Sequence, residues 1–167
     1  MVARANPRWL AGRLRLAVLA ALAVFLAVSL VYTQVIATSD RHAVAWRDLT
    51  AELGAVSFPR QVTRVIRSQE QLVSVLEEQM PGNAPVPPPI DFSRREALLA
   101  AVGPRSSTGY DLRVVSVTEQ RDRIVVRLRE RTPGLRDRVA ARLTFPYRLI
   151  TIPASSKPVR FRLEDRP

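Results

Sequence analysis

The sequence lacks cysteine altogether and has only one histidine, His42, and one lysine, Lys157. Without cysteine, the chain forms no disulfide, no thiolate metal site and no acylated lipoprotein anchor. His42 stands in a predicted linker, where it activates no nucleophile, and no Ser-x-x-Lys spacing surrounds Lys157. A glycine-rich phosphate loop is also missing. The sequence therefore predicts a protein that is not an enzyme and that holds no metal and no cofactor.

Acidic residues are too few to balance the basic ones, and the net charge is +11. Such a surface attracts anions, among them nucleic acid, lipid headgroups and acidic proteins. Nucleic-acid readers add aromatic stacking platforms, whereas Phe145 and Tyr147 flank a proline and are expected in the core. We therefore expect no nucleic acid as partner. Attraction to anionic lipid is the alternative, through outward-facing arginines of a sheet: Arg127, Arg129, Arg160 and Arg162.

No charged residue occurs in residues 16–39. As a helix, residues 14–36 would be about 34 Å long, enough for a hydrocarbon core of about 30 Å. Arginines but no acids precede this run, so the positive-inside rule places residues 1–13 in the cytoplasm. We therefore expect a single-pass protein of the cell membrane, with an N-terminal transmembrane helix and an extracytoplasmic C-terminal domain. A signal peptide cleaved near Ala37 is the alternative.

The rest of the chain reads as a stalk or linker with a short helix, residues 37–60, and a domain, residues 61–167. A capping box formed by Ser68 and Gln71 predicts a helix that ends near residue 79. β-branched or alternating segments predict strands, with a bulge at Val114 and Val115. These strands are residues 61–67, 97–102, 110–119, 124–129, 138–145, 147–152 and 159–163. The predicted fold class is α+β: the transmembrane helix, then a mostly antiparallel sandwich or barrel-like sheet with one or two short helices.

One loop between predicted strands, residues 103–110, combines proline, serine and glycine. Gly109 can take a positive φ and Tyr110 begins the next strand. Because functional residues concentrate on loops held by a rigid sheet, we expect this loop to bind a partner. The expected contact residues are Arg105, Ser106, Ser107, Thr108, Gly109 and Tyr110.

The order of motifs around this loop resembles the PrcB C-terminal domain family. Gly103, Gly109 and Tyr110 keep the register of that family's loop motif, while Ser107 and Thr108 stand where it usually has Thr and Gly. A Pro-Gly turn and a Thr-x-Pro-Tyr motif follow downstream, and the resemblance covers about residues 62–163. The family is named for an accessory subunit of a bacterial surface protease complex. The resemblance implies a β-rich, non-catalytic module that stabilises or docks a protease complex.

A second resemblance concerns only Thr108, Gly109 and Tyr110, which are similar to the Thr-Gly-Tyr loop of the chagasin-like inhibitors of cysteine proteases. The Asn-Pro that normally begins that loop is absent here. A protease inhibitor that uses residues 107–110 is therefore an alternative to the accessory module.

Overall fold

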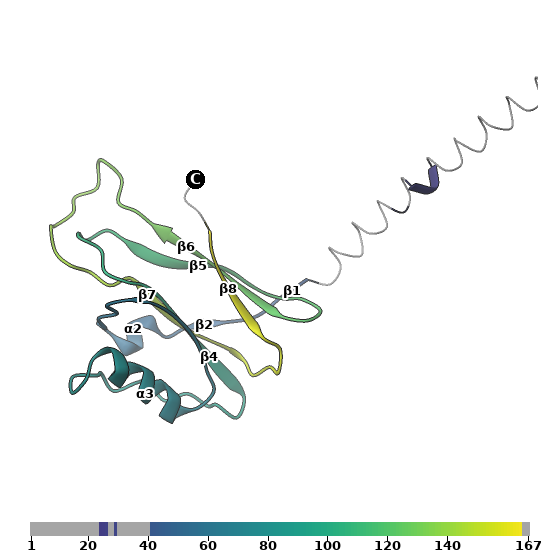
Figure 1. The fold of residues 1–167 in the computed structure, drawn as a ribbon, viewed down its shortest axis with the longest axis horizontal. Helices are drawn as coiled ribbons and strands as arrows, with labels where there is room; N and C mark the ends of the chain where they lie inside the picture. Colours follow the sequence, from purple (N-terminus) through teal and green to yellow (C-terminus); the bar gives the residue numbers. More distant parts are fainter. Residues whose placement is uncertain (1–23, 27–28, 30–40, 165–167) are drawn as a thin grey trace, which may run out of the picture. The chain divides into compact units, whose positions relative to one another are not determined.

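A computed structural model describes residues 24–26, 29 and 41–164 of the chain (Figure 1). Contacts divide the chain after Asp40, and the compact unit considered below begins at Arg41. It therefore starts before residue 61, where the sequence suggested a domain boundary.

The prediction of a membrane-spanning helix is contradicted by the described part of the structure. In the part of the chain that is described, no helix is long and apolar enough to cross a membrane. A crossing takes about 20 consecutive apolar residues, whereas the longest helix with described bounds, Gln69–Gln79, has 11 residues and carries glutamates. Of the predicted span, only residues 24–26 and 29 are described, as helical and exposed, and the others lie outside the described residues. The fold class is corrected to a small β-rich domain, and the predicted single-pass cell-membrane location is not supported.

Two four-stranded sheets build the domain. The first has the order β1-β5-β6-β8, with strands β1 (His42–Ala43), β5 (Asp111–Glu119), β6 (Ile124–Arg131) and β8 (Val159–Glu164). The second has the order β2-β7-β4-β3, with strands β2 (Arg47–Asp48), β7 (Tyr147–Pro153), β4 (Arg95–Val102) and β3 (Gln61–Ile66). All neighbours are antiparallel except β6 and β8, which run parallel.

Two short helices, α2 (Thr50–Leu53) and α3 (Gln69–Gln79), cover the second sheet on the side away from β5 and β6 (Figure 1). The predicted capping of α3 is confirmed: the Ser68 hydroxyl accepts from the Gln71 amide at 3.2 Å. Leu72 and Leu76, one turn apart, are fully buried against the sheet. The domain thus has three layers, with one core beneath the helices and one between the sheets.

Strand β4 lies between the two cores, which explains its uninterrupted apolar run. Ala97, Leu99 and Ala101 face the helices, and Leu98 and Ala100 face the other sheet. The predicted bulge in β5 is also confirmed, because the register with β6 shifts between Val114 and Ser116. The extra residue, Val115, is 46% exposed, and inward-facing residues continue on both sides of it.

Two segments differ from the sequence prediction. Residues 138–145 do not form a strand; they belong to a long connection between β6 and β7, with one isolated bridge at Thr144. β7 already pairs with β4 along this side of the sheet. Residues 138–145 therefore have no strand with which to form a continuous ladder. The predicted stalk supplies β1, β2 and α2, and its Leu49, Leu53 and Phe58 are buried in the core beneath the helices.

Candidate functional site: two interlocked loops

Two loops lie side by side at one end of the domain: the β4–β5 loop (residues 103–110) and the β6–β7 loop (residues 132–146). The Arg105 amide donates to the Thr144 carbonyl at 2.8 Å, and the Thr144 amide donates back to Arg105 at 2.9 Å. This pair of bonds anchors the two loops to each other next to the start of β7. The predicted partner-binding loop is therefore half of a larger structure.

Side-chain hydrogen bonds extend this contact. The Thr108 hydroxyl accepts from the Ala140 amide at 2.9 Å, and the Thr108 amide donates to the Ala140 carbonyl at 3.0 Å. The Thr144 hydroxyl donates to the Ser107 carbonyl at 2.8 Å. Thr108 has an ordinary negative φ, since no described residue other than glycine has a positive one. Threonine thus fits a position where the resembled family usually has glycine.

Arg105 occupies an internal position. Its Nη2 donates to Glu130 Oε2 at 2.9 Å, its Nε donates to Glu130 Oε1, and its Nη1 donates to the Val102 carbonyl at 3.1 Å. The Arg105 side chain is 25% exposed and that of Glu130 is 9% exposed. The hydrogen bond to Glu130 raises the pKa of Arg105 further above its already high ordinary value. A bidentate pair of this kind holds the β4–β5 loop on the end of β6.

Glycines shape both ends of the β4–β5 loop. Gly103 has φ +80° and is buried against the backbone of Arg60 and Gln61. Gly109 has φ +92°, and a Cβ there would lie 3.0 Å from Pro133 Cβ and from Val139 Cγ1. The β6–β7 loop therefore packs so closely on Gly109 that a side chain there would require Pro133 or Val139 to shift.

The six predicted contact residues divide into two groups. Ser106 and Gly109 are exposed, whereas Arg105, Ser107, Thr108 and Tyr110 are half-buried. The Arg105 guanidinium carbon lies 6.0 Å from the centre of the Tyr110 ring, so this arginine also covers the aromatic face. Their role in partner binding stays a prediction, and Ser106 is the side chain best placed for direct contact.

Exposed apolar side chains gather on the β6–β7 loop, of which residues 138–145 are predicted by the sequence to form a strand. Leu135 is 109% exposed, Leu143 60% and Val139 44%. Arginines alternate with them and are exposed as well: Arg136, Arg138 and Arg142. The three aliphatic residues recur every four positions, a spacing that also places side chains on one face of a strand, so the sequence pattern did not distinguish this loop from a strand.

The base of the β6–β7 loop is ordered by a tight turn. The Gly134 amide donates to Asp137 Oδ2 at 3.0 Å, and the Asp137 amide donates to the Gly134 carbonyl at 3.0 Å. Arg131 pairs with the same carboxylate oxygen at 3.1 Å. The loop therefore presents its apolar side chains from a hydrogen-bonded frame.

The arginines predicted to meet anionic lipid lie on the outer face of the first sheet and are all exposed. Arg127 and Arg129 share Glu164, at 3.8 and 2.6 Å. Arg160 and Arg162 form no ion pair with any described residue. The positive charge of this face is thus partly neutralised on β6 and left open on β8, and contact with lipid stays a prediction.

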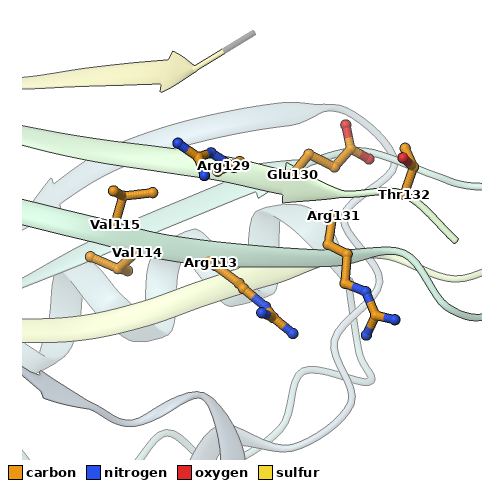
Figure 2. Close-up of a pocket in the computed structure, with 7 residues that line it drawn as sticks. All are labelled: Arg113, Val114, Val115, Arg129, Glu130, Arg131 and Thr132. Atoms are coloured by element: carbon orange, nitrogen blue, oxygen red, sulfur yellow. The ribbon is translucent and has the colours of Figure 1, made fainter. Parts of the chain in front are cut away.

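A hollow of about 520 Å³ lies over β5 and β6 (Figure 2). Figure 2 shows Arg113 and Arg131 extending in the same direction from neighbouring strands. Each of the arginines that line the hollow has an acidic partner: Arg113 pairs with Asp111, Arg129 with Glu164 and Arg131 with Asp137. The hollow therefore offers no unopposed charge to an anion.

Lys157, the one lysine of the chain, forms contacts that stabilise the fold. Lys157 Nζ pairs with Glu119 at 2.7 Å and donates to the Gln120 carbonyl at 3.0 Å, while its amide donates to the Ser155 hydroxyl. Within the described residues, no group of three or more histidine, aspartate or glutamate side chains gathers where it could hold a metal ion.

Fold and loops together define a small two-sheet β domain with one end built from two interlocked loops. Residues 97–153 match the family described as PrcB C-terminal. The match runs from β4 to β7 and includes both loops, but it is narrower than the range over which the sequence resemblance was expected. No curated protein and no solved structure matches the chain.

Proposed function

We propose that this domain is a non-catalytic protein-binding module that contacts its partner with the paired β4–β5 and β6–β7 loops. The observation that carries the proposal is the exposure of three aliphatic side chains, Leu135, Val139 and Leu143, on a loop with an ordered base. Exposed apolar residues gathered in one place are characteristic of protein interfaces. The PrcB C-terminal match includes both loops and is compatible with an accessory role in a protease complex.

The two loops have different tasks in this proposal. Arg105 and Thr108 hold the β4–β5 loop in place, because their polar atoms are already bonded to Glu130 and Ala140. Ser106 and the aliphatic side chains of the β6–β7 loop face solvent and meet the partner. Exposed arginines around them favour a partner with an acidic rim.

Site-specific photocrosslinking in native cells tests the interface. A photoreactive amino acid at Leu135 or Leu143 should crosslink one defined protein, and the double variant Leu135→Ser/Leu143→Ser should lose that protein. The matched control is Val73 on α3, an aliphatic residue that is 41% exposed and lies outside the loops. Equal crosslinking from Val73, or full retention of the partner by the serine double variant, would contradict the proposal.

The non-catalytic part of the proposal has its own test. Lys157 is already paired with Glu119, so it is not positioned as a free base for a neighbouring serine. The purified protein should therefore not turn over peptide or ester substrates. Turnover that disappears in Ser107→Ala would overturn this part. Inhibition of a cysteine protease that Gly109→Ala abolishes would favour the chagasin-like alternative instead.

A further inference from the structure

Strand β8 (Val159–Glu164) ends the first sheet and is paired along only one of its edges, with β6. Among the described residues, no strand pairs with its other edge. An unpaired edge presents a row of amide and carbonyl groups to which an extended peptide can add as a further strand. Such addition needs side-chain contacts for specificity, and β8 supplies two kinds.

The first kind is a cavity of about 150 Å³ between the sheets, lined by apolar side chains and by the polar residues Gln61 and Thr63. Phe161 and Leu163 of β8 line it together with Leu112 and Leu128, and Thr63 of β3 lies on its opposite side. Leu163 is 45% exposed. A cavity of about 150 Å³ has room for a group as large as benzene, so one leucine or phenylalanine side chain fits beside the apolar residues of β8.

The second kind is unopposed positive charge. Along β8, Phe161 packs toward the core, whereas the alternate residues Arg160 and Arg162 are exposed on the other face of the strand. Neither of these arginines has an acidic partner among the described residues, because Glu164 is paired with Arg127 and Arg129. A strand laid along β8 would therefore place alternate side chains at the cavity and beside the two arginines.

We propose that the free edge of β8 binds an extended segment of a partner protein in which large apolar and acidic residues alternate. The apolar residues enter the cavity beside Leu163, and the acidic ones pair with Arg160 and Arg162. A second copy of this chain is a poor occupant, because pairing β8 with itself brings arginines of like charge together. This surface is separate from the two loops, and the proposal does not depend on their function.

A labelled peptide as long as β8, with alternating leucine and glutamate, is the probe. Fluorescence anisotropy with the full chain should show binding of this peptide, while a peptide of the same composition with the leucines in one block should bind at least tenfold more weakly. Hydrogen exchange should slow on the β8 amides. The variant Arg160→Glu/Arg162→Glu should weaken binding at least tenfold, and Leu163→Ser should weaken it severalfold, with unchanged melting temperatures.

The matched control is Arg136→Glu/Arg138→Glu on the β6–β7 loop, which makes the same charge change but should retain the peptide. Equal binding of the alternating and block peptides would overturn the proposal, as would loss of binding in the loop control only. A concentration-dependent dimer with slowed β8 exchange would also overturn it, in favour of a second copy. Crosslinking from Leu135 and Leu143 reports on the loops alone, so failure of one proposal is distinguishable from failure of the other.

Discussion

Arg105 on the β4–β5 loop and Glu130 at the end of β6 form a bidentate ion pair, with Nη2 and Oε2 2.9 Å apart. The pair joins residues 25 positions apart in the chain and is largely withdrawn from solvent. Removing one member of such a pair leaves the other charge uncompensated, which costs more than the pair itself contributes.

Arg105→Ala should therefore lower the free energy of unfolding by about 2–3 kcal/mol in urea titrations. Arg113→Ala is the control, because its pair with Asp111 is exposed and should be worth less than about 1 kcal/mol. Ser106→Ala should leave the stability unchanged, since Ser106 is exposed. An Arg105→Ala effect no larger than that of Arg113→Ala would show that the ion pair does not hold the loop.

Gly109→Ala should destabilise the protein by about 1–3 kcal/mol, because alanine at a positive φ is strained and its Cβ meets Pro133 and Val139. Adding Val139→Ala should recover part of this loss by removing one of the contacted atoms. Gly134→Ala is the control: the nearest heavy atom to its Cβ would be Asp137 Oδ2 at 4.0 Å. Equal thermal shifts for the Gly109 and Gly134 variants would contradict the close packing of the loops.

Stability should depend on pH through Glu96, a buried residue of β4. Burial raises the pKa of its carboxyl above the usual 4.5, and Arg67, 3.0 Å away, opposes this only in part. The folded state thus holds the proton more tightly than the unfolded chain. This contribution to stability is complete below pH 4.5 and is lost as the pH rises through the raised pKa.

Glu96→Gln removes this titration, so the free energy of unfolding should fall less above pH 4.5 than in the wild type. Denaturant titrations at several pH values measure the difference. Glu78→Gln, an exposed change on α3, should retain the wild-type profile. Parallel profiles for the Glu96 variant and the wild type would refute the assignment.

Tyr147 of β7 ties the start of the domain to the second sheet, since its hydroxyl donates to the carbonyls of Gly54 and Thr50, the latter at 3.1 Å. Tyr147→Phe should cost about 1 kcal/mol of stability through the lost hydrogen bonds. Tyr110→Phe is the control, because no hydrogen bond of the Tyr110 hydroxyl is found within the described chain. A larger loss for Tyr110→Phe would contradict this role.

Tyr147 should also make the stability of the folded state fall at alkaline pH. Burial raises the pKa of Tyr147 from 10.0 to about 12, so the folded state disfavours the phenolate. Stability from this group is complete below pH 10 and is lost as the pH rises through about 12. In alkaline titrations followed by circular dichroism, Tyr147→Phe should lack this component of the loss.

Local sequence patterns determined much of the fold. Ser68 and Gln71 predicted where α3 begins, and the structure agrees. Capping is a contact between residues close in the chain, so the sequence alone reveals it. β-branched composition indicated β3, alternation indicated β6 and β8, and the slip in alternation at Val114 and Val115 indicated the bulge. The apolar run of residues 97–102 predicted a strand, and the structure shows why it does not alternate: it is covered on both faces.

Tertiary structure decided the rest. Residues 41–60 join the core instead of forming a stalk, because β7 pairs with β2 and Tyr147 bonds to the turn after α2. The loop position of Arg105 predicted contact with a partner, yet folding brings Glu130 to its guanidinium. Residues 132–146 form a loop because no neighbouring strand lies beside them to pair with. Periodicity reports which side of a segment is apolar, whereas strand partners and ion pairs depend on residues distant in the chain, which only folding brings together.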